Sequence, residues 1–203
     1  MNKVRDIKVV MFDLGNVIIC FDHMIAAEKI AKYCDRRPQE IYDLFFYSDL
    51  TEKFDSGKID EDEFFNEVKN LLNLNGLDKP GFYKIWNDIF WENPGIAEVI
   101  TEVKRHYDKF FIISNVNKPH FEYIWREFPI VREADEIILS YEIGVLKPAP
   151  EIYKIAIEKA QCLPSEVFYT DDRPELIQAA KTMGLQACLF QGVNSIKNLI
   201  FGQ

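Results

Sequence analysis

Four apolar residues run directly into an aspartate near the start of this chain, in the order Val9-Val10-Met11-Phe12-Asp13. A continuous apolar run that ends at a turn is typical of a strand buried on both faces, as in a parallel sheet. A carboxylate at the carboxyl end of such a strand lies where open α/β sheets place their chemistry. Taken alone, Asp13 could equally be a residue that only caps the next turn, so its role has to be judged from the rest of the sequence.

Composition limits the kind of protein that this chain can be. Its 203 residues, 48% of them apolar, are enough for one α/β domain with a modest insertion. The net charge of -9 argues against a nucleic-acid partner. The four cysteines are scattered, which favours a reducing compartment, and no apolar run approaches the ~20 residues that span a bilayer. We expect a cytoplasmic protein without a membrane partner, either a monomer or a homodimer.

The hydrophobic pattern changes twice along the chain. Residues 18–92 show mainly helical spacing, as in Phe64, Phe65, Val68, Leu71 and Leu72. After residue 92, short apolar strands alternate with helical segments, which predicts a parallel sheet. We therefore expect an α/β fold, with a Rossmann-like parallel sheet covered by helices on both faces over residues 1–17 and 93–203. A small all-helical cap domain, residues 18–92, would be inserted after the first strand; we call it the helical insert.

Polar residues follow four of the predicted core segments. They are Asp13, the pair Ser114-Asn115, Lys147 in a loop, and the pair Asp171-Asp172. In a parallel sheet the carboxyl ends of the strands meet at one edge, so these side chains are expected to converge. Taken singly, these residues could be ordinary turn residues, a solvated lysine or helix caps. The four together, in this order, form a candidate active site.

The motifs around these residues resemble those of the haloacid dehalogenase-like hydrolase superfamily, in its branch with a small helical cap. The resemblance covers essentially the whole chain. The chain is also similar to sugar-1-phosphate phosphatases and to the phosphatase domain of soluble epoxide hydrolases. The four matching stretches are Phe12-Asp13-Leu14-Gly15-Asn16-Val17, Ile113-Ser114-Asn115, Ser140 to Pro148 with Lys147, and Val167 to Asp172.

This resemblance implies a Mg²⁺-dependent phosphatase that acts on a small phosphorylated metabolite such as a sugar phosphate. Asp13 would be the nucleophile that forms an aspartyl phosphate. The ion would be held by Asp13, the Gly15 carbonyl and Asp172, with Asp171 beside it or bound through water. Ser114, the Asn115 amide and Lys147 would hold the phosphoryl oxygens, and Lys147 would neutralise their charge.

Two positions depart from the pattern of the family. Its members usually carry a second aspartate two residues after the nucleophile, as general acid and base, and here that position is Gly15. We expect Asp22 and His23, which follow soon after, to be ordinary hinge or helix-capping residues. After Asp172 the stretch Arg173-Pro174-Glu175-Leu176 replaces the usual asparagine-bearing one. For Glu175 two interpretations stay open: an acid in a helix first turn, or a group that orients Lys147 or a metal-bound water.

Two other functions remain as alternatives. A 2-haloacid dehalogenase also lacks the second aspartate, but it needs no metal and carries an arginine soon after the nucleophile. The first arginines here are Arg36 and Arg37, which are far along. The other alternative is a catalytically weak protein that binds a phosphorylated ligand. Six residues of the helical insert are candidates to face a substrate: Phe21, His23, Phe45, Phe46, Phe54 and Trp91.

Overall fold

The computed structural model describes residues 6–46 and 48–202, except the side chain of Phe46. At its centre lies a parallel sheet in the order β5-β4-β1-β6-β7. The strands are β1 (Val9–Phe12), β4 (Lys109–Ser114), β5 (Glu136–Leu139), β6 (Val167–Asp171) and β7 (Gln186–Leu189). The predicted α/β class with a parallel sheet is therefore confirmed. The order of the sheet reverses between β1 and β6, which is where open α/β sheets bind their ligands.

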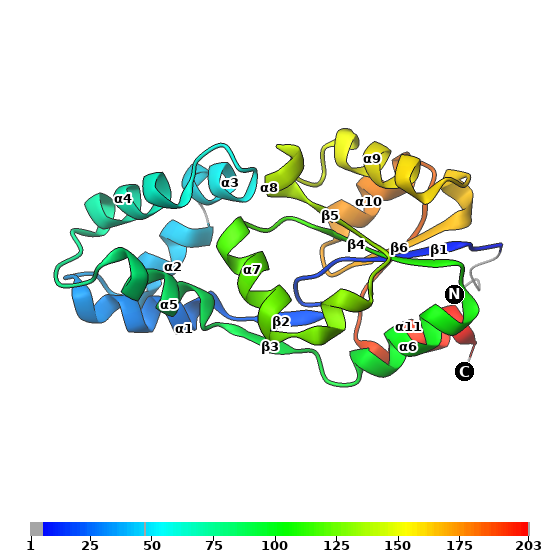
Figure 1. Cartoon of the computed structure of the whole chain (residues 1–203), viewed down its shortest axis with the longest axis horizontal. Coiled ribbons are helices and arrows are strands. Elements are labelled where there is room, and N and C mark those ends of the chain that lie inside the picture. Colours follow the sequence, from blue (N-terminus) through cyan, green and yellow to red (C-terminus); the bar gives the residue numbers. More distant parts are fainter. Residues whose placement is uncertain (1–5, 47, 203) are drawn as a thin grey trace.

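Helices cover both faces of this sheet (Figure 1). On one side lie α6 (Ile96–His106) and α11 (Val193–Phe201), and on the other lie α9 (Pro150–Ala160) and α10 (Pro174–Thr182). The core also contains α7 (Lys118–Glu127) and α8 (Ser140–Ile143), together with short 3-10 turns at Pro129–Glu133 and Pro164–Glu166. Helix α11 follows the last predicted strand and was not predicted.

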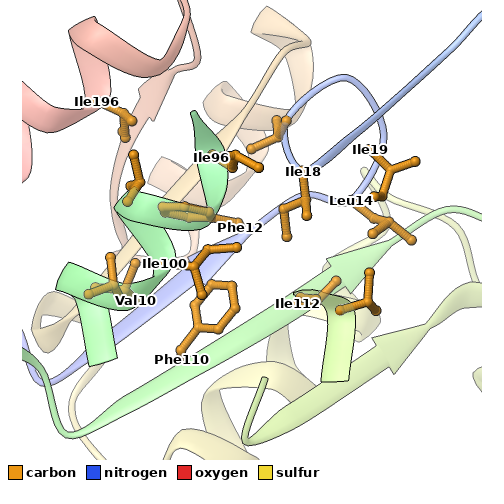
Figure 2. Packing of buried hydrophobic residues seen from close by; sticks show 14 of the residues in the cluster. Val10, Phe12, Leu14, Ile18, Ile19, Ile96, Ile100, Phe110, Ile112 and Ile196 are labelled. Carbon is orange, nitrogen blue, oxygen red and sulfur yellow. The ribbon is translucent and has the colours of Figure 1, made fainter. Parts of the chain in front are cut away.

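Successive side chains of a strand point to opposite faces of the sheet, and in the central strands both faces are covered by helices, which explains why their apolar runs are continuous. Val10 and Phe12 of β1 pack with α6 and α11, whereas Val9 and Met11 pack with α9 and α10. Figure 2 shows the first of these clusters, in which Phe12 and Phe110 of the sheet lie close to Ile96 and Ile100 of α6. The Phe12 and Phe110 rings meet edge to face at 5.4 Å. Each such buried side chain contributes about 1.5–3 kcal/mol, so β1 has little freedom to lie elsewhere.

The helical insert builds a hydrophobic cluster of its own. It contains α1 (His23–Ile30), a 3-10 turn at Ala31–Tyr33, α2 (Pro38–Phe46), α3 (Asp49–Asp55), α4 (Glu61–Leu72) and α5 (Lys79–Asn87). Helix α4 begins with a capping box, in which Asp60 and Glu63 each bond the backbone of the other. Phe64 of α4 and Trp86 of α5 are fully buried in this cluster.

A two-stranded antiparallel ribbon connects the helical insert to the core. It pairs β2 (Ile19–Phe21) with β3 (Phe90–Glu92), so that Phe21 faces Phe90 across the ribbon. The sequence pattern predicts helices here, but each strand is only three residues long and its pairing depends on contacts distant in sequence. The ribbon brings the two ends of the helical insert side by side. The division at residues 17 and 93 remains a prediction.

The far end of the helical insert also contacts the core. Asn117, which caps α7, donates from Nδ2 to Asp55 Oδ1 at 2.9 Å, and Ser140 Oγ donates to the Asp55 carbonyl at 2.6 Å. A side chain at Gly57 would lie 2.3 Å from the Tyr141 carbonyl, and Gly57 has a φ of +65°. Only glycine fits such a close approach with that backbone conformation.

Among the described residues, no helix is long and apolar enough to cross a membrane.

Candidate functional site

The predicted site residues converge at the carboxyl ends of the central strands. Asp13 follows β1, Ser114 is the last residue of β4, and Asp171 is the last residue of β6. The amide of Asp13 donates to the Thr170 carbonyl at 2.9 Å, which extends the β1–β6 ladder and places Asp13 beside Asp171. These positions lie at the point where the sheet order reverses, as expected for a ligand site in this topology.

Lys147 is buried at the centre of this group. Its Nζ lies 2.6 Å from Asp13 Oδ1 and 2.8 Å from Asp171 Oδ2. The same Nζ donates to the Ile113 carbonyl at 3.0 Å and to the Tyr169 hydroxyl at 3.1 Å. The side chains of Lys147 and Asp171 are at most 1% exposed and that of Asp13 is 10% exposed. The lysine is therefore held in one position by four oxygen atoms.

Two residues that hold this lysine in place were not predicted for that role. Asn115 bonds the backbone of Lys147 twice, from Nδ2 to the Lys147 carbonyl at 2.9 Å and from the Lys147 amide to Oδ1 at 2.7 Å. Tyr169 also hydrogen-bonds Asp171. A sequence signal existed for Tyr169, because it lies two residues before Asp171 on a strand and so shares its face. The prediction that the Asn115 backbone amide binds phosphoryl oxygens stays a prediction, and the side chain of Asn115 has the additional role of bonding the Lys147 backbone.

Burial and charge together shift the pKa values of this group. Burial, with a smaller contribution from Asp171, raises the pKa of Asp13 to about 7 against the opposing effect of Lys147. Burial alone would raise the pKa of Asp171, but Lys147 holds it below the ordinary value. For Lys147, burial lowers the pKa, and the carboxylates of Asp13 and Asp171 outweigh that and raise it. The three groups thus share one buried network in which negative charge is in excess.

This excess of carboxylates fits a hard divalent cation. Asp13, Asp171 and Asp172 offer carboxylate oxygens that all lie within 4.8 Å of one another. Asp172 is partly buried, and burial raises its pKa, although Asn16 donates to its Oδ2 at 3.1 Å and opposes the rise. Mg²⁺ takes few protein carboxylates and keeps several waters, which suits a group in which Asp13 and Asp172 are partly exposed. Asn16 was not predicted as part of this group.

Several predicted candidates lie elsewhere or serve other purposes. Of the two interpretations left open for Glu175, the structure favours the first-turn acid, because Glu175 is exposed in the first turn of α10 and pairs with Arg173 at 2.5 Å. Asp22 caps α1 by accepting from the Met24 amide at 2.8 Å, as expected for a helix-capping residue. Two of the proposed substrate-facing aromatics have another role, because Phe45 and Phe54 are buried in the cluster of the helical insert. The side chain of Phe46 lies outside the described residues.

Known proteins are similar to this chain over most of its length. The family model described as haloacid dehalogenase-like hydrolase matches residues 10–190. A D-ribitol-5-phosphate phosphatase from Bacteroides thetaiotaomicron is 27% identical over 189 residues, covering 89% of this chain and 90% of the relative.

Solved structures of a haloacid dehalogenase-family enzyme from the same organism share the fold. One has a TM-score of 0.84 at 22% identity and covers 95% of this chain and 98% of that chain. Another, in complex with magnesium and inorganic phosphate, has a TM-score of 0.80 at 24% identity and covers 92% and 95%. With the family model spanning all the strand ends described above, the chain belongs to the haloacid dehalogenase-like hydrolases.

Proposed function

We propose that this hydrolase is a Mg²⁺-dependent phosphatase acting on a small phosphorylated metabolite through an aspartyl-phosphate intermediate. The observation that carries the proposal is the buried Lys147, which joins Asp13 to Asp171 with Asp172 less than 4.8 Å away. One lysine beside three carboxylates provides a nucleophile, a phosphate-binding charge and ligands for a hard cation at one edge of the sheet.

Each residue then has a role that follows from its position. Asp13, the least buried of the three network groups, is the nucleophile that attacks phosphorus. Lys147, held by Asn115 and Tyr169, neutralises charge on the phosphoryl oxygens, and Ser114 and the Asn115 amide position these oxygens. Asp13, the Gly15 carbonyl and Asp172 would hold Mg²⁺, with Asp171 behind them. The bound ion supplies further charge neutralisation for the phosphoryl group.

The substrate class that best suits these features is a phosphorylated carbohydrate. The 27% identical relative that extends over most of this chain is named for D-ribitol 5-phosphate. A single buried lysine and a divalent ion would also supply the local positive charge that an anionic substrate needs in a chain of net charge -9.

The test is release of inorganic phosphate from an aryl phosphate and from a panel of sugar and sugar-alcohol phosphates, with Mg²⁺ and with a chelator. We expect release that requires Mg²⁺ and that Asp172→Ala strongly reduces. The matched control is Asp62→Ala, which removes an exposed carboxylate paired with Lys79 and should leave the rate unchanged. Turnover of a 2-haloacid in the presence of chelator would support the dehalogenase alternative, and binding without release would support the phospho-ligand-binding one.

A further inference from the structure

The place of the missing general acid is occupied by an aromatic ring. A Cβ added to Gly15 would lie 2.9 Å from Phe21 Cε1 and 3.8 Å from Asp13 Oδ2. A side chain at residue 15 would therefore stand beside the nucleophile, where the ring edge of Phe21 now lies. Gly15 has no positive φ, so its backbone would accept another residue. The obstacle at Gly15 is the Phe21 ring.

Contacts with the helical insert hold the Phe21 ring in this place. It lies on β2, opposite Phe90 of β3, and packs with the hydrophobic cluster of the helical insert. Its ring meets His23 at 5.1 Å and Phe90 at 6.1 Å between centroids, both edge to face. Moving the ring would disturb contacts worth about 0.5–1.5 kcal/mol for each aromatic pair.

The titratable groups near this ring are poorly suited to replace an acid. Burial lowers the pKa of His23 to about 4, so its ring is neutral at pH 7. Asp22 is exposed and occupied in capping α1. The ammonium of Lys147 already faces four acceptors. Within the described part of the chain, the space at Gly15 beside the nucleophile is therefore occupied by the apolar edge of the Phe21 ring and not by a proton donor.

We propose that Phe21 is a specificity-determining residue, because it fills the position of the general acid and restricts the enzyme to phosphates carried on acidic hydroxyls. Such hydroxyls are those of phenols, enols, hemiacetals and carboxylic acids, in contrast to primary alcohols. This inference rests on the proposed phosphatase function. It narrows the substrate class from any phosphorylated metabolite to one whose leaving group departs without a proton.

The bonds made and broken account for this restriction. A carboxylate oxygen of Asp13 forms a bond to phosphorus while the bond from phosphorus to the leaving oxygen breaks. The electron pair of the broken bond stays on the leaving oxygen, which departs as an anion and takes its proton from solvent. Water then attacks phosphorus, the electron pair of the acyl phosphate bond returns to Asp13, and one water proton goes to solvent. A general acid contributes about 10²–10⁴-fold to the first of these steps when the leaving group is poor.

The experiment measures kcat/KM for nitrophenyl, phenyl and ethyl phosphate, with saturating Mg²⁺, in four proteins: wild type, Gly15→Asp, Phe21→Ala and the double variant. For the wild type we expect kcat/KM to fall steeply as the leaving group becomes less acidic. In the double variant it should rise for ethyl phosphate by about 10²-fold or more, with little change for nitrophenyl phosphate. Gly15→Asp alone should gain much less, because the ring still occupies the space.

Trp125→Ala is the control, since it removes an exposed aromatic ring of α7 that does not contact Phe21 or line the space at Gly15. It should keep the steep dependence of the wild type. A wild-type kcat/KM that hardly varies with the leaving group would overturn the inference while leaving the phosphatase function intact. A gain in Gly15→Asp equal to that of the double variant would show that Phe21 is no obstacle. No release from any ester by folded wild type would reject the proposed function, and the inference with it.

Discussion

Asp13 is the residue whose replacement separates chemistry from folding most cleanly. Asp13→Asn keeps the size of the side chain but removes the nucleophilic carboxylate, so phosphate release should fall by more than about 10³-fold. The fold should survive, because burial already disfavours the charged form and holds the pKa of Asp13 at about 7. Phosphate-release assays and thermal unfolding measure the two effects. Full activity in a clean preparation of this variant would exclude the covalent route.

Lys147 is expected to matter for stability as well as for phosphate binding. Lys147→Ala leaves Asp13 and Asp171 buried without their shared cation, and breaking such a buried pair costs about 3–5 kcal/mol. Lys159→Ala is the matched control, because it removes a surface ion pair with Glu136 at 2.9 Å that contributes about 0–1 kcal/mol. Urea unfolding in the presence of chelator measures both. Equal losses of stability in the two variants would mean that the Lys147 network is solvated.

At the scale of elements, helix α7 links the core to the helical insert. Its N-cap Asn117 donates to Asp55 at 2.9 Å and lies 3.2 Å from His120 Nδ1, while His120 Nε2 lies 3.1 Å from the Trp86 carbonyl. A carbonyl only accepts, so Nε2 carries the proton and Nδ1 accepts from Asn117. Two bonds from α7 thereby reach α3 and α5 of the helical insert.

Asn117→Ala should loosen this junction. It removes the cap of α7 and both side-chain bonds, so faster hydrogen exchange is expected in α3 as well as in α7. Asp60→Ala is the control: it removes an N-cap of similar strength, about 1 kcal/mol, that bonds only within α4. Exchange mass spectrometry measures the two segments separately. Unchanged exchange in α3 for Asn117→Ala would contradict a structural link between α7 and the helical insert.

The same junction should weaken in acid. Burial, followed by the effect of His23, lowers the pKa of His120 well below its ordinary 6.5, so the folded protein holds the ring neutral and the unfolded chain protonates it. Its stabilising contribution is present above about pH 6.5 and is lost as the pH falls. The lowered pKa of His23, about 4, acts with the same sign, whereas burial raises the pKa of Asp55 to about 6 and acts with the opposite sign.

Comparison with His120→Phe isolates this effect, because His23 and Asp55 are present in both proteins. The free energy of unfolding should fall less between pH 7 and pH 5 in the variant than in the wild type. Urea titrations at the two pH values measure the difference. An equal fall in both proteins would show that His120 is protonated in the folded state.

Elements whose structure is determined by the local sequence can be predicted, whereas elements that form through contacts distant in sequence cannot. Fully apolar β1 and the alternating segments after residue 92 carry strong local patterns, so the parallel sheet was predictable. Strands β2 and β3 and helix α8 span three or four residues each and form through contacts distant in sequence. The position of Asp13, Lys147 and Asp171 followed from motif order. The roles of Asn115 and Asn16 depend on side-chain direction outside the strands, where no regular period applies, and the role of Phe21 depends on a ribbon formed by contacts distant in sequence.

At the scale of the whole molecule, one cluster of three carboxylates and a lysine lies at the carboxyl edge of the sheet, in a chain of net charge -9. Three carboxylates with one lysine should bind a divalent cation even without substrate. Mg²⁺ is therefore expected to raise the melting temperature, by an amount that grows with its concentration. Asp172→Ala should lose most of this shift, and Asp62→Ala should retain it. A shift of equal size in both variants would place the cation elsewhere.

The most direct test of the central claim, that Asp13 carries the phosphoryl group, is to trap the intermediate. Wild-type protein reacting with nitrophenyl phosphate and Mg²⁺ is quenched in acid, digested and analysed by mass spectrometry. We expect a phosphorylated peptide that contains Asp13 and that is absent from Asp13→Asn. It should accumulate because the Phe21 ring leaves no base at residue 15 to activate water. Steady release of phosphate with the Asp13 peptide unmodified at every quench time would exclude Asp13 as the carrier of the phosphoryl group.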